Sequence, residues 1–92
     1  MAMKKINIEP HTLQRMEERG VEKAEVIEVI RNGKDFDVKY NRHGKYKIFD
    51  FNDEYLGKYY RHKRVEVIYI EEDEEVVTVT VMAFYGKWEE RI

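Results

Sequence analysis

The chain has 92 residues, a net charge of −2 and no cysteine. This length predicts a single domain over residues 1–92 with one small core. The absence of cysteine excludes disulfides and thiolate metal sites. No apolar run reaches the length of a signal-peptide core or a membrane span, so we expect a cytoplasmic protein with no membrane contact.

The composition indicates a folded protein with an uneven distribution of charge. Hydrophobic residues make up 42% of the chain and aromatic residues 13%, which argues against disorder. Serine is absent, and lysine and glutamate are abundant, a bias found in proteins from hot environments. Residues 39–64 contain eight Lys or Arg and three acids, whereas residues 71–75 read EEDEE. This separation predicts a cationic surface on an acidic protein.

The N-terminal third predicts a strand followed by a helix. Residues 5–9, KINIE, alternate apolar and polar side chains, which is typical of a short strand. Pro10 suits the first helical turn because its missing N–H costs nothing there, and Gly20 suits a left-handed cap at the helix end. Leu13 and Met16 are expected to form the apolar side of this helix.

A second helix is predicted at about 22–32. Val26, Val29 and Ile30 form its apolar stripe, and Asn32-Gly33 ends it. Because about two residues separate it from the first helix, the two are expected to form a helical hairpin.

From residue 35 onward the apolar period is two, which indicates strands. Residues 35–40 and 45–51 are expected to pair across the turn at 41–44, and residues 55–61 and 65–72 to form a hairpin around 62–64. Residues 76–85, VVTVTVMAFY, have the strongest strand pattern. The predicted fold is α+β: a short N-terminal strand, a two-helix hairpin and a three- to four-stranded antiparallel sheet covered by the helices on one face.

Three motifs resemble one family. They are H-x3-R-M-x2-R-G-V at 11–21, EYLGKYYRHKRVEVIY at 54–69 and VTVTVMAFY at 77–85. Together they resemble the family of domain of unknown function 4258. The order of the elements is also similar to that of the RelE and BrnT toxins, a fold group with ribonucleases paired with antitoxins. The resemblance implies a toxin-like domain with a cognate antitoxin as partner, although the pI near 5.9 is lower than is usual for such toxins.

The first candidate site lies on the first helix, where His11, Arg15 and Arg19 recur every four residues and share one side. An imidazole can move the 2′-hydroxyl proton of RNA, and guanidinium groups stabilise the charge at phosphorus. RNA supplies its own nucleophile, so this reaction needs neither metal ion nor cofactor. The structural alternative is that Arg15 and Arg19 pair with Glu18, Glu22 or carboxylates of the sheet, and that His11 is only a helix-start residue.

A second basic stretch, rich in tyrosine, runs from residue 58 to residue 64. Cations attract phosphates, and tyrosine rings offer faces on which unpaired bases stack. The nucleic-acid-binding candidates are Arg19, Lys58, Tyr60, Lys63 and Arg64. The structural alternative is a pair of hairpins whose tyrosines pack across strands while lysines protect an edge.

The predicted function is an RNA-binding, toxin-like domain whose candidate reaction is RNA cleavage without a metal ion. His11 is the candidate proton carrier, and Arg15 and Arg61 are the candidates that hold the phosphate. By resemblance to RelE-like folds, Tyr85 contacts the substrate. The three histidines lack paired ligand spacing, so no metal site is predicted. The alternative is a non-enzymatic protein-interaction module that uses the basic sheet face or an edge strand.

Overall fold

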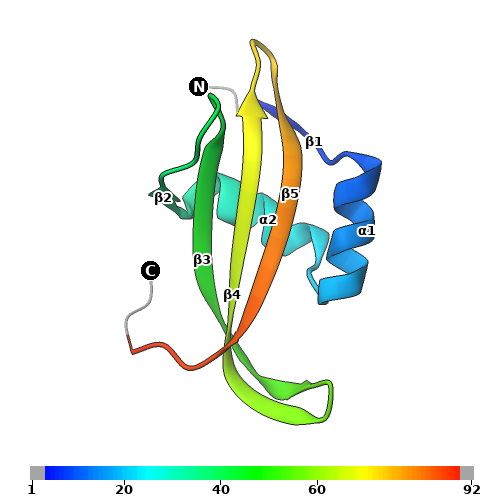
Figure 1. Cartoon of the computed structure of the whole chain (residues 1–92), viewed down its shortest axis with the longest axis vertical. Helices are drawn as coiled ribbons and strands as arrows, with labels where there is room; N and C mark the ends of the chain where they lie inside the picture. Colours follow the sequence, from blue (N-terminus) through cyan, green and yellow to red (C-terminus); the bar gives the residue numbers. More distant parts are fainter. Residues whose placement is uncertain (1–3, 90–92) are drawn as a thin grey trace.

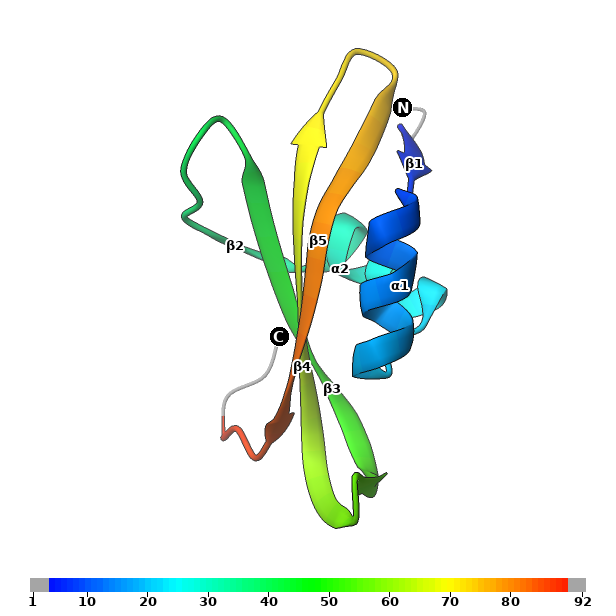
Figure 2. The same cartoon turned by 45° about the vertical axis from the view of Figure 1, so that its right-hand side comes forward.

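The computed structural model describes residues 4–89. Its elements follow in the order β1 (Lys5–Asn7), α1 (Pro10–Arg19), α2 (Lys23–Asn32), β2 (Lys34–Phe36), β3 (His43–Tyr55), β4 (Lys58–Glu71) and β5 (Glu75–Gly86). Figure 1 shows α1 beside β5 with α2 behind the sheet, and Figure 2 shows both helices on one side of it. The predicted α+β class, with its strand, helical hairpin and sheet, is confirmed. Within residues 4–89, no helix is long and apolar enough to span a membrane.

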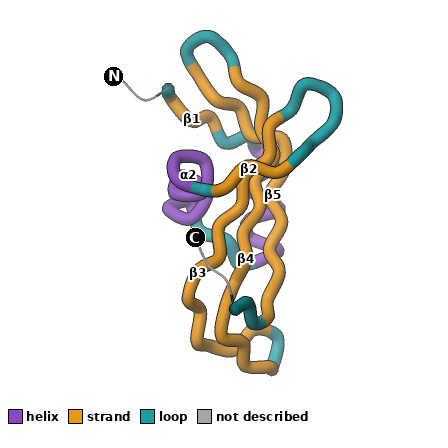
Figure 3. The backbone as a smooth tube through the Cα atoms, turned by 90° about the vertical axis from the view of Figure 1, so that its left-hand side faces the viewer, coloured by secondary structure: helices purple, strands orange, loops and turns teal. Residues whose placement is uncertain are grey.

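The sheet has five strands in the order β1-β5-β4-β3-β2, more than the three or four predicted. β1 runs parallel to β5, and the other neighbouring strands are antiparallel. β1 is the short N-terminal strand that the sequence predicts, and it joins the sheet at one edge. β2, at the other edge, has three residues, which is too short for a strong alternating pattern. Figure 3 shows how the long strands β3, β4 and β5 make up most of the sheet.

The predicted hairpin around residues 62–64 is wrong, because residues 58–71 form one continuous strand. The turn lies earlier, at Leu56 and Gly57, which both have positive φ (52° and 83°). Two such residues make a turn whose twist matches antiparallel strands. The sequence does not predict this turn, because leucine rarely adopts a positive φ. The three successive basic residues at 62–64 instead favour a loop.

The helix ends follow the local signals in the sequence. Pro10 is the first residue of α1, and Gly20 ends it in the left-handed region (φ 70°) with its N–H bonded to the Met16 carbonyl. At the start of α2, the backbone N–H of Glu22 donates to Glu25 Oε1 at 2.9 Å. The predicted helical hairpin is therefore confirmed, with a connection of three residues.

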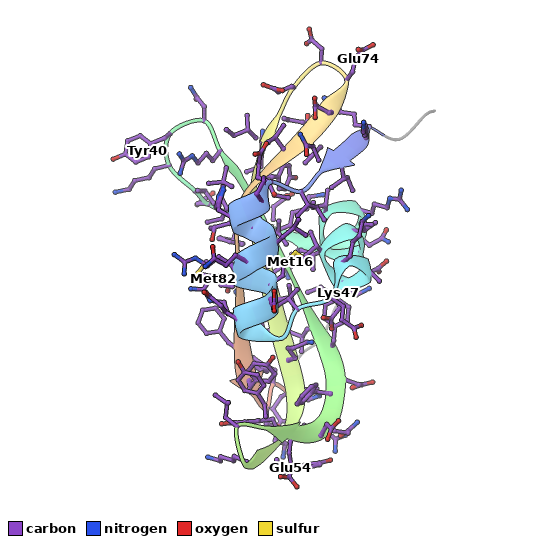
Figure 4. The ribbon with its side chains drawn as sticks, turned by 90° about the vertical axis from the view of Figure 1, so that its right-hand side faces the viewer. Met16, Tyr40, Lys47, Glu54, Glu74 and Met82 are labelled. Carbon is purple, nitrogen blue, oxygen red and sulfur yellow. The ribbon has the colours of Figure 1, made fainter. Side chains whose placement is uncertain are left out.

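One hydrophobic core lies between the helices and the sheet. Its buried side chains are Met16, Val21, Val26, Val29, Ile30, Val65, Val67, Tyr69, Val76 and Val81. Figure 4 shows Met16 between α1 and α2. Leu13 was expected on the apolar side of α1 but is 48% exposed, and Thr12 is fully buried instead. The face of α1 that meets the sheet therefore contains Met16, as predicted, but Thr12 in place of Leu13.

Candidate nucleic-acid interface

The basic side of α1 lies along the edge of β5. His11 Nε2 donates to the carbonyl of Val79, and Arg19 Nη1 donates to the carbonyl of Val81 at 2.7 Å. β1 pairs with β5 only as far as Val77, so no strand of the described chain covers these two carbonyls. The two basic side chains therefore satisfy backbone groups on an otherwise open strand edge.

Arg15 lies on the outward side of α1 and is 51% exposed. Its Nη1 atom is 3.1 Å from Glu18 Oε1. This is the exposed ion pair that the structural alternative described for Arg15, and such pairs contribute little to stability. His11 and Arg15 thus have different surroundings although they lie one turn apart.

Three side chains of the sheet bind carbonyl groups at the end of α1. They are the Tyr55 hydroxyl, which donates to Glu18 (3.2 Å), the Tyr85 hydroxyl, which donates to Arg19 (2.7 Å), and Lys63 Nζ, which donates to Gly20 (2.9 Å). The last carbonyls of a helix have no partner within it, so these contacts satisfy groups that would otherwise need water. A cation at this end is also favoured by the helix dipole.

Lys63 is a buried cation with a partly buried partner, Glu25. Its side chain is 6% exposed, its Nζ atom is 2.8 Å from Glu25 Oε1, and the same atom lies 5.5 Å from the centre of the Phe51 ring. Strand alternation places Lys63 on the helix-covered face, opposite Tyr85. An ammonium group enclosed in this way is not available to a phosphate at the surface.

Tyr85 is held within an aromatic cluster. Its ring stacks on Tyr55, with centres 4.0 Å apart, and meets the edge of Phe51 at 5.1 Å. Burial, followed by the nearby Tyr55 and Glu25, raises the pKa of Tyr85 to about 12. The hydroxyl therefore stays protonated and serves as a donor to the Arg19 carbonyl.

Arg64 lies on the sheet face opposite the helices. Its guanidinium carbon is 3.8 Å from the centre of the Tyr46 ring, and Nε donates to Glu66 at 2.7 Å. The exposed Phe84 is its partner on β5. This face is therefore mixed, with apolar and paired charged groups, rather than the basic face expected.

The other candidates gather where the β3–β4 hairpin extends beyond the helices (Figure 1). Lys58 Nζ lies 5.6 Å from the ring centre of Tyr60, and Tyr59 is 59% exposed. Arg61 is also exposed. Neither Lys58 nor Arg61 has an ion pair within residues 4–89. In the described part of the chain, two exposed cations without carboxylate partners thus lie beside the exposed Tyr59 and the half-buried Tyr60.

A polar pocket of about 320 Å³ opens at the same end, lined by Arg61, His62, Lys87, Trp88 and Glu89. His62 is 3% exposed, and its Nδ1 accepts a hydrogen bond from the Trp88 N–H at 3.0 Å. The neutral ring therefore carries its proton on Nε2, which lies 3.8 Å from Asp50 Oδ1. The sequence reasoning placed His62 in a turn. Recognising Leu56-Gly57 as the turn would have placed it inside a strand instead.

The structure separates the four catalytic candidates. His11 is held at Val79, a bulge residue of β5 beside Ile68 of β4. Arg61 precedes Ile68 by seven residues in the same strand, which corresponds to about 23 Å. Tyr85 pairs with Lys63, close to Arg61, but its hydroxyl points to the α1 end. Within residues 4–89, no three His, Asp or Glu side chains are grouped as metal ligands are.

Residues 8–83 match the family described as Domain of unknown function (DUF4258). The match includes both helices and most of the sheet. No curated protein and no solved structure matches the chain. The likeness to the RelE and BrnT toxins therefore stays a prediction.

Proposed function

The chain belongs to the family of domain of unknown function 4258, and from its geometry we propose that it binds single-stranded RNA at the end of the β3–β4 hairpin. One observation carries the proposal. Lys58 and Arg61 are exposed, have no ion pair within residues 4–89, and lie beside Tyr59, Tyr60 and a polar pocket. Unpaired cations next to accessible aromatic rings are what a single strand needs, because phosphates and bases alternate along it.

The acids of the same hairpin limit the affinity that we expect. Asp53 pairs with Tyr60 and Glu54 with Tyr59 across the two strands, so carboxylates lie close to the proposed contacts. Binding should therefore be modest and strongly salt-dependent. The mobile phosphates of a single strand can avoid these carboxylates more easily than a rigid duplex can.

The stronger form of the proposal is cleavage of the bound RNA without a metal ion, together with control by an antitoxin protein. His11 is about 23 Å from Arg61 along the sheet, so a phosphate bound at the hairpin does not reach it. His62 shares the pocket with Arg61, but its Nδ1 is occupied by the Trp88 N–H. RNA binding is therefore the primary activity proposed, and cleavage needs its own test.

Fluorescence anisotropy with a labelled short oligouridine tests the binding. Arg61→Glu and Lys58→Glu should each weaken the affinity by about tenfold, because each replaces a phosphate partner by a repelling charge. Lys23→Glu changes the net charge equally at the exposed start of α2 and should leave the affinity within about twofold of the wild type. Equal weakening by all three variants would show a non-specific charge effect. Absence of salt-sensitive binding by the wild type would remove the proposal.

Incubation of RNA with the wild type in EDTA tests the stronger form. Cleavage that is lost in His62→Gln but kept in His11→Gln would assign the reaction to the pocket. The opposite pattern would assign it to α1. If the wild type leaves the RNA intact, the cleavage claim fails and the binding claim is unaffected.

Protein binding is the second candidate function, and a different feature favours it. At the other end of the sheet, a pocket of about 170 Å³ is lined by Ile6, Ile30 and Val76 together with charged side chains of both signs.

A further inference from the structure

The sheet face opposite the helices has an apolar patch that no helix of residues 4–89 covers. Figure 2 shows both helices on the other side of the sheet, and Figure 4 shows Met82 on the side away from α2. Strand pairing places the patch across β3, β4 and β5, around Arg64 and Glu66. Its apolar members are Tyr46, Ile68, Ile70, Val77, Met82 and Phe84, and none of them belongs to the core between the helices and the sheet.

The residue types in this patch are those of a covered surface. An antiparallel sheet with one face in water alternates apolar and polar side chains along each strand. In β5, however, the positions on this outer face are Val77, Thr80, Met82 and Phe84. Phe84 is 46% exposed and Ile70 is 39% exposed. Monomeric soluble proteins seldom expose a continuous apolar patch of several hundred Å², so the patch indicates an interface.

Trp88 extends the patch at the end near the β3–β4 hairpin. Gly86 pairs with His62, and both lie on the same face as Arg64 by strand alternation. A methyl group in place of the Gly86 hydrogen would lie 3.4 Å from the Trp88 ring. The half-buried Trp88 ring therefore lies over this face, at the end opposite Ile70.

The size of the patch matches a small protein interface. From His62 to Ile70, β4 extends about 26 Å, and three neighbouring strands are about 14 Å wide. Because side-chain relief adds to the flat area, two such patches in contact would bury on the order of 1,000 Å². This value is near the lower limit for a specific interface, so the association should be reversible, with a Kd on the order of 100 µM.

The charges on this face complement those of a second copy. Arg64 and Glu66 lie two residues apart on β4, the central strand of the sheet, and bond to each other at 2.7 Å. Lys34 and Asp50 flank the patch with one charge of each sign. The face therefore has no net charge that would select an acidic or a basic partner. A two-fold axis crossing β4 between positions 64 and 66 places each of these two side chains over the opposite charge of the second copy.

The same axis brings apolar side chains together. It places Phe84 over Met82 of the second copy, and Ile68 over the end at which Trp88 lies. It also sends the acidic turn at 71–75 of the two copies to opposite ends, where these carboxylates do not face each other. An axis along the strands would instead place Arg64 over Arg64, which is unfavourable.

We propose that this chain forms a symmetric dimer in which the two outer sheet faces pack on each other with antiparallel β4 strands. Two sheets pack face to face about 10 Å apart, with their side chains interdigitated. The apolar patch is then buried, and each Arg64 faces a Glu66 of the second copy. The dimer rests on the sheet face alone and does not depend on RNA binding.

Sedimentation equilibrium of the full chain between about 10 µM and 1 mM tests the dimer. The wild type should change from monomer to dimer within this range. Phe84→Lys should raise the Kd at least about tenfold, because it places an ammonium group over Met82 of the second copy. Leu13→Lys is the matched control, since Leu13 is 48% exposed on α1. It should leave the Kd within about twofold of the wild type.

A charge exchange tests the two-fold arrangement. Arg64→Glu and Glu66→Arg should each weaken the dimer at least about tenfold, because each places like charges over one another. An equimolar mixture of these two variants should dimerise again, since opposite charges then meet at both contacts. The double variant Arg64→Glu/Glu66→Arg should also dimerise. Recovery in the mixture shows that the single variants are folded.

Each other result would contradict the dimer or its geometry. A wild type that stays monomeric at 1 mM overturns the proposal, as does a dimer that Phe84→Lys leaves unchanged. Loss of the dimer in both charge variants without recovery in their mixture overturns the two-fold axis. Oligouridine that shifts the amide signals of Ile68 and Phe84 in a monomeric chain would assign this face to RNA. Arg61→Glu should remain dimeric, so failure of RNA binding at the hairpin is distinguishable from failure of the dimer.

Discussion

Lys63 connects β4 to both helices of this fold. Its ammonium group binds the Gly20 carbonyl at the end of α1 and Glu25 in the first turn of α2. The same carboxylate accepts the backbone N–H of Glu22. One cation from the middle of β4 therefore fixes the angle at which the helical hairpin lies on the sheet.

Replacing Lys63 should cost much of the stability of the domain. In Lys63→Met, Glu25 stays largely buried without its cation, and we expect the free energy of unfolding to fall by about 3 kcal/mol. Urea denaturation followed by circular dichroism measures this change. Lys58→Met, at the exposed hairpin end, should change it by less than about 0.5 kcal/mol. If the double variant Lys63→Met/Glu25→Gln is no more stable than Lys63→Met, the stability is lost through packing rather than through the unpaired charge of Glu25.

Tyr85 should make stability depend on alkaline pH. Its pKa is raised to about 12 by burial in the folded chain, whereas the unfolded chain loses this proton near its ordinary value of 10. Between these two values the folded state holds more protons, so the free energy of unfolding falls as pH rises through this range. Urea denaturation at successive alkaline pH values should show this fall, and it should be smaller in Tyr85→Phe. Tyr69 contributes in the same direction, because burial also raises its pKa.

At the scale of elements, α1 acts as cover for the open edge of β5. His11 and Arg19 bind two successive outward carbonyls, and the Glu9 N–H donates to the Thr78 hydroxyl at 3.1 Å. Arg19→Met should therefore loosen α1 while the sheet stays intact. Hydrogen exchange of the α1 amides should become faster, with the amides of β4 little changed. Arg15→Met removes only an exposed ion pair and should leave both rates as they are.

A substitution in the β3–β4 turn should stabilise the domain. Leu56 has φ 52° and is 89% exposed, so its side chain adds strain and little packing. Leu56→Asn provides the residue that this turn prefers, and we expect about 1 kcal/mol of added stability in thermal denaturation. Leu56→Ala has the same left-handed strain and should give no gain. A gain of equal size in both variants would mean that exposure of leucine, and not backbone strain, is the cause.

At the scale of the whole molecule, carboxylates lie at both ends of the long strands. Figure 4 shows Glu74 at one end and Glu54, near the proposed RNA surface, at the other. With Lys58 and Arg61 as phosphate contacts, the logarithm of the RNA affinity should fall with the logarithm of the salt concentration at a slope of about −1.4. Arg61→Met should reduce this slope by about 0.7. A slope near zero would contradict phosphate contact at the hairpin.

Much of the fold could be predicted because its signals are local. The helices are specified by residues that act on their neighbours in the chain: Pro10 and Gly20 at the ends of α1, and the stripe of Val26, Val29 and Ile30 in α2. The candidate site was harder. Whether a basic side chain is free or already bonded depends on groups far away in sequence, such as the Gly20 carbonyl for Lys63 or the Val81 carbonyl for Arg19.

The sequence by itself determined the helical hairpin, its ends, the α+β class and the family motif at residues 11–21. Only the tertiary structure decided that residues 62–64 lie inside a strand. There, Lys63 is bound by Glu25 and the Gly20 carbonyl, and His62 accepts a hydrogen bond from the Trp88 N–H. It also decided that His11 and Arg19 bind the β5 edge while Lys58 and Arg61 remain exposed. The physical reason is that a buried charge or imidazole needs a partner, and the partners of Lys63 and His62 come from distant parts of the chain.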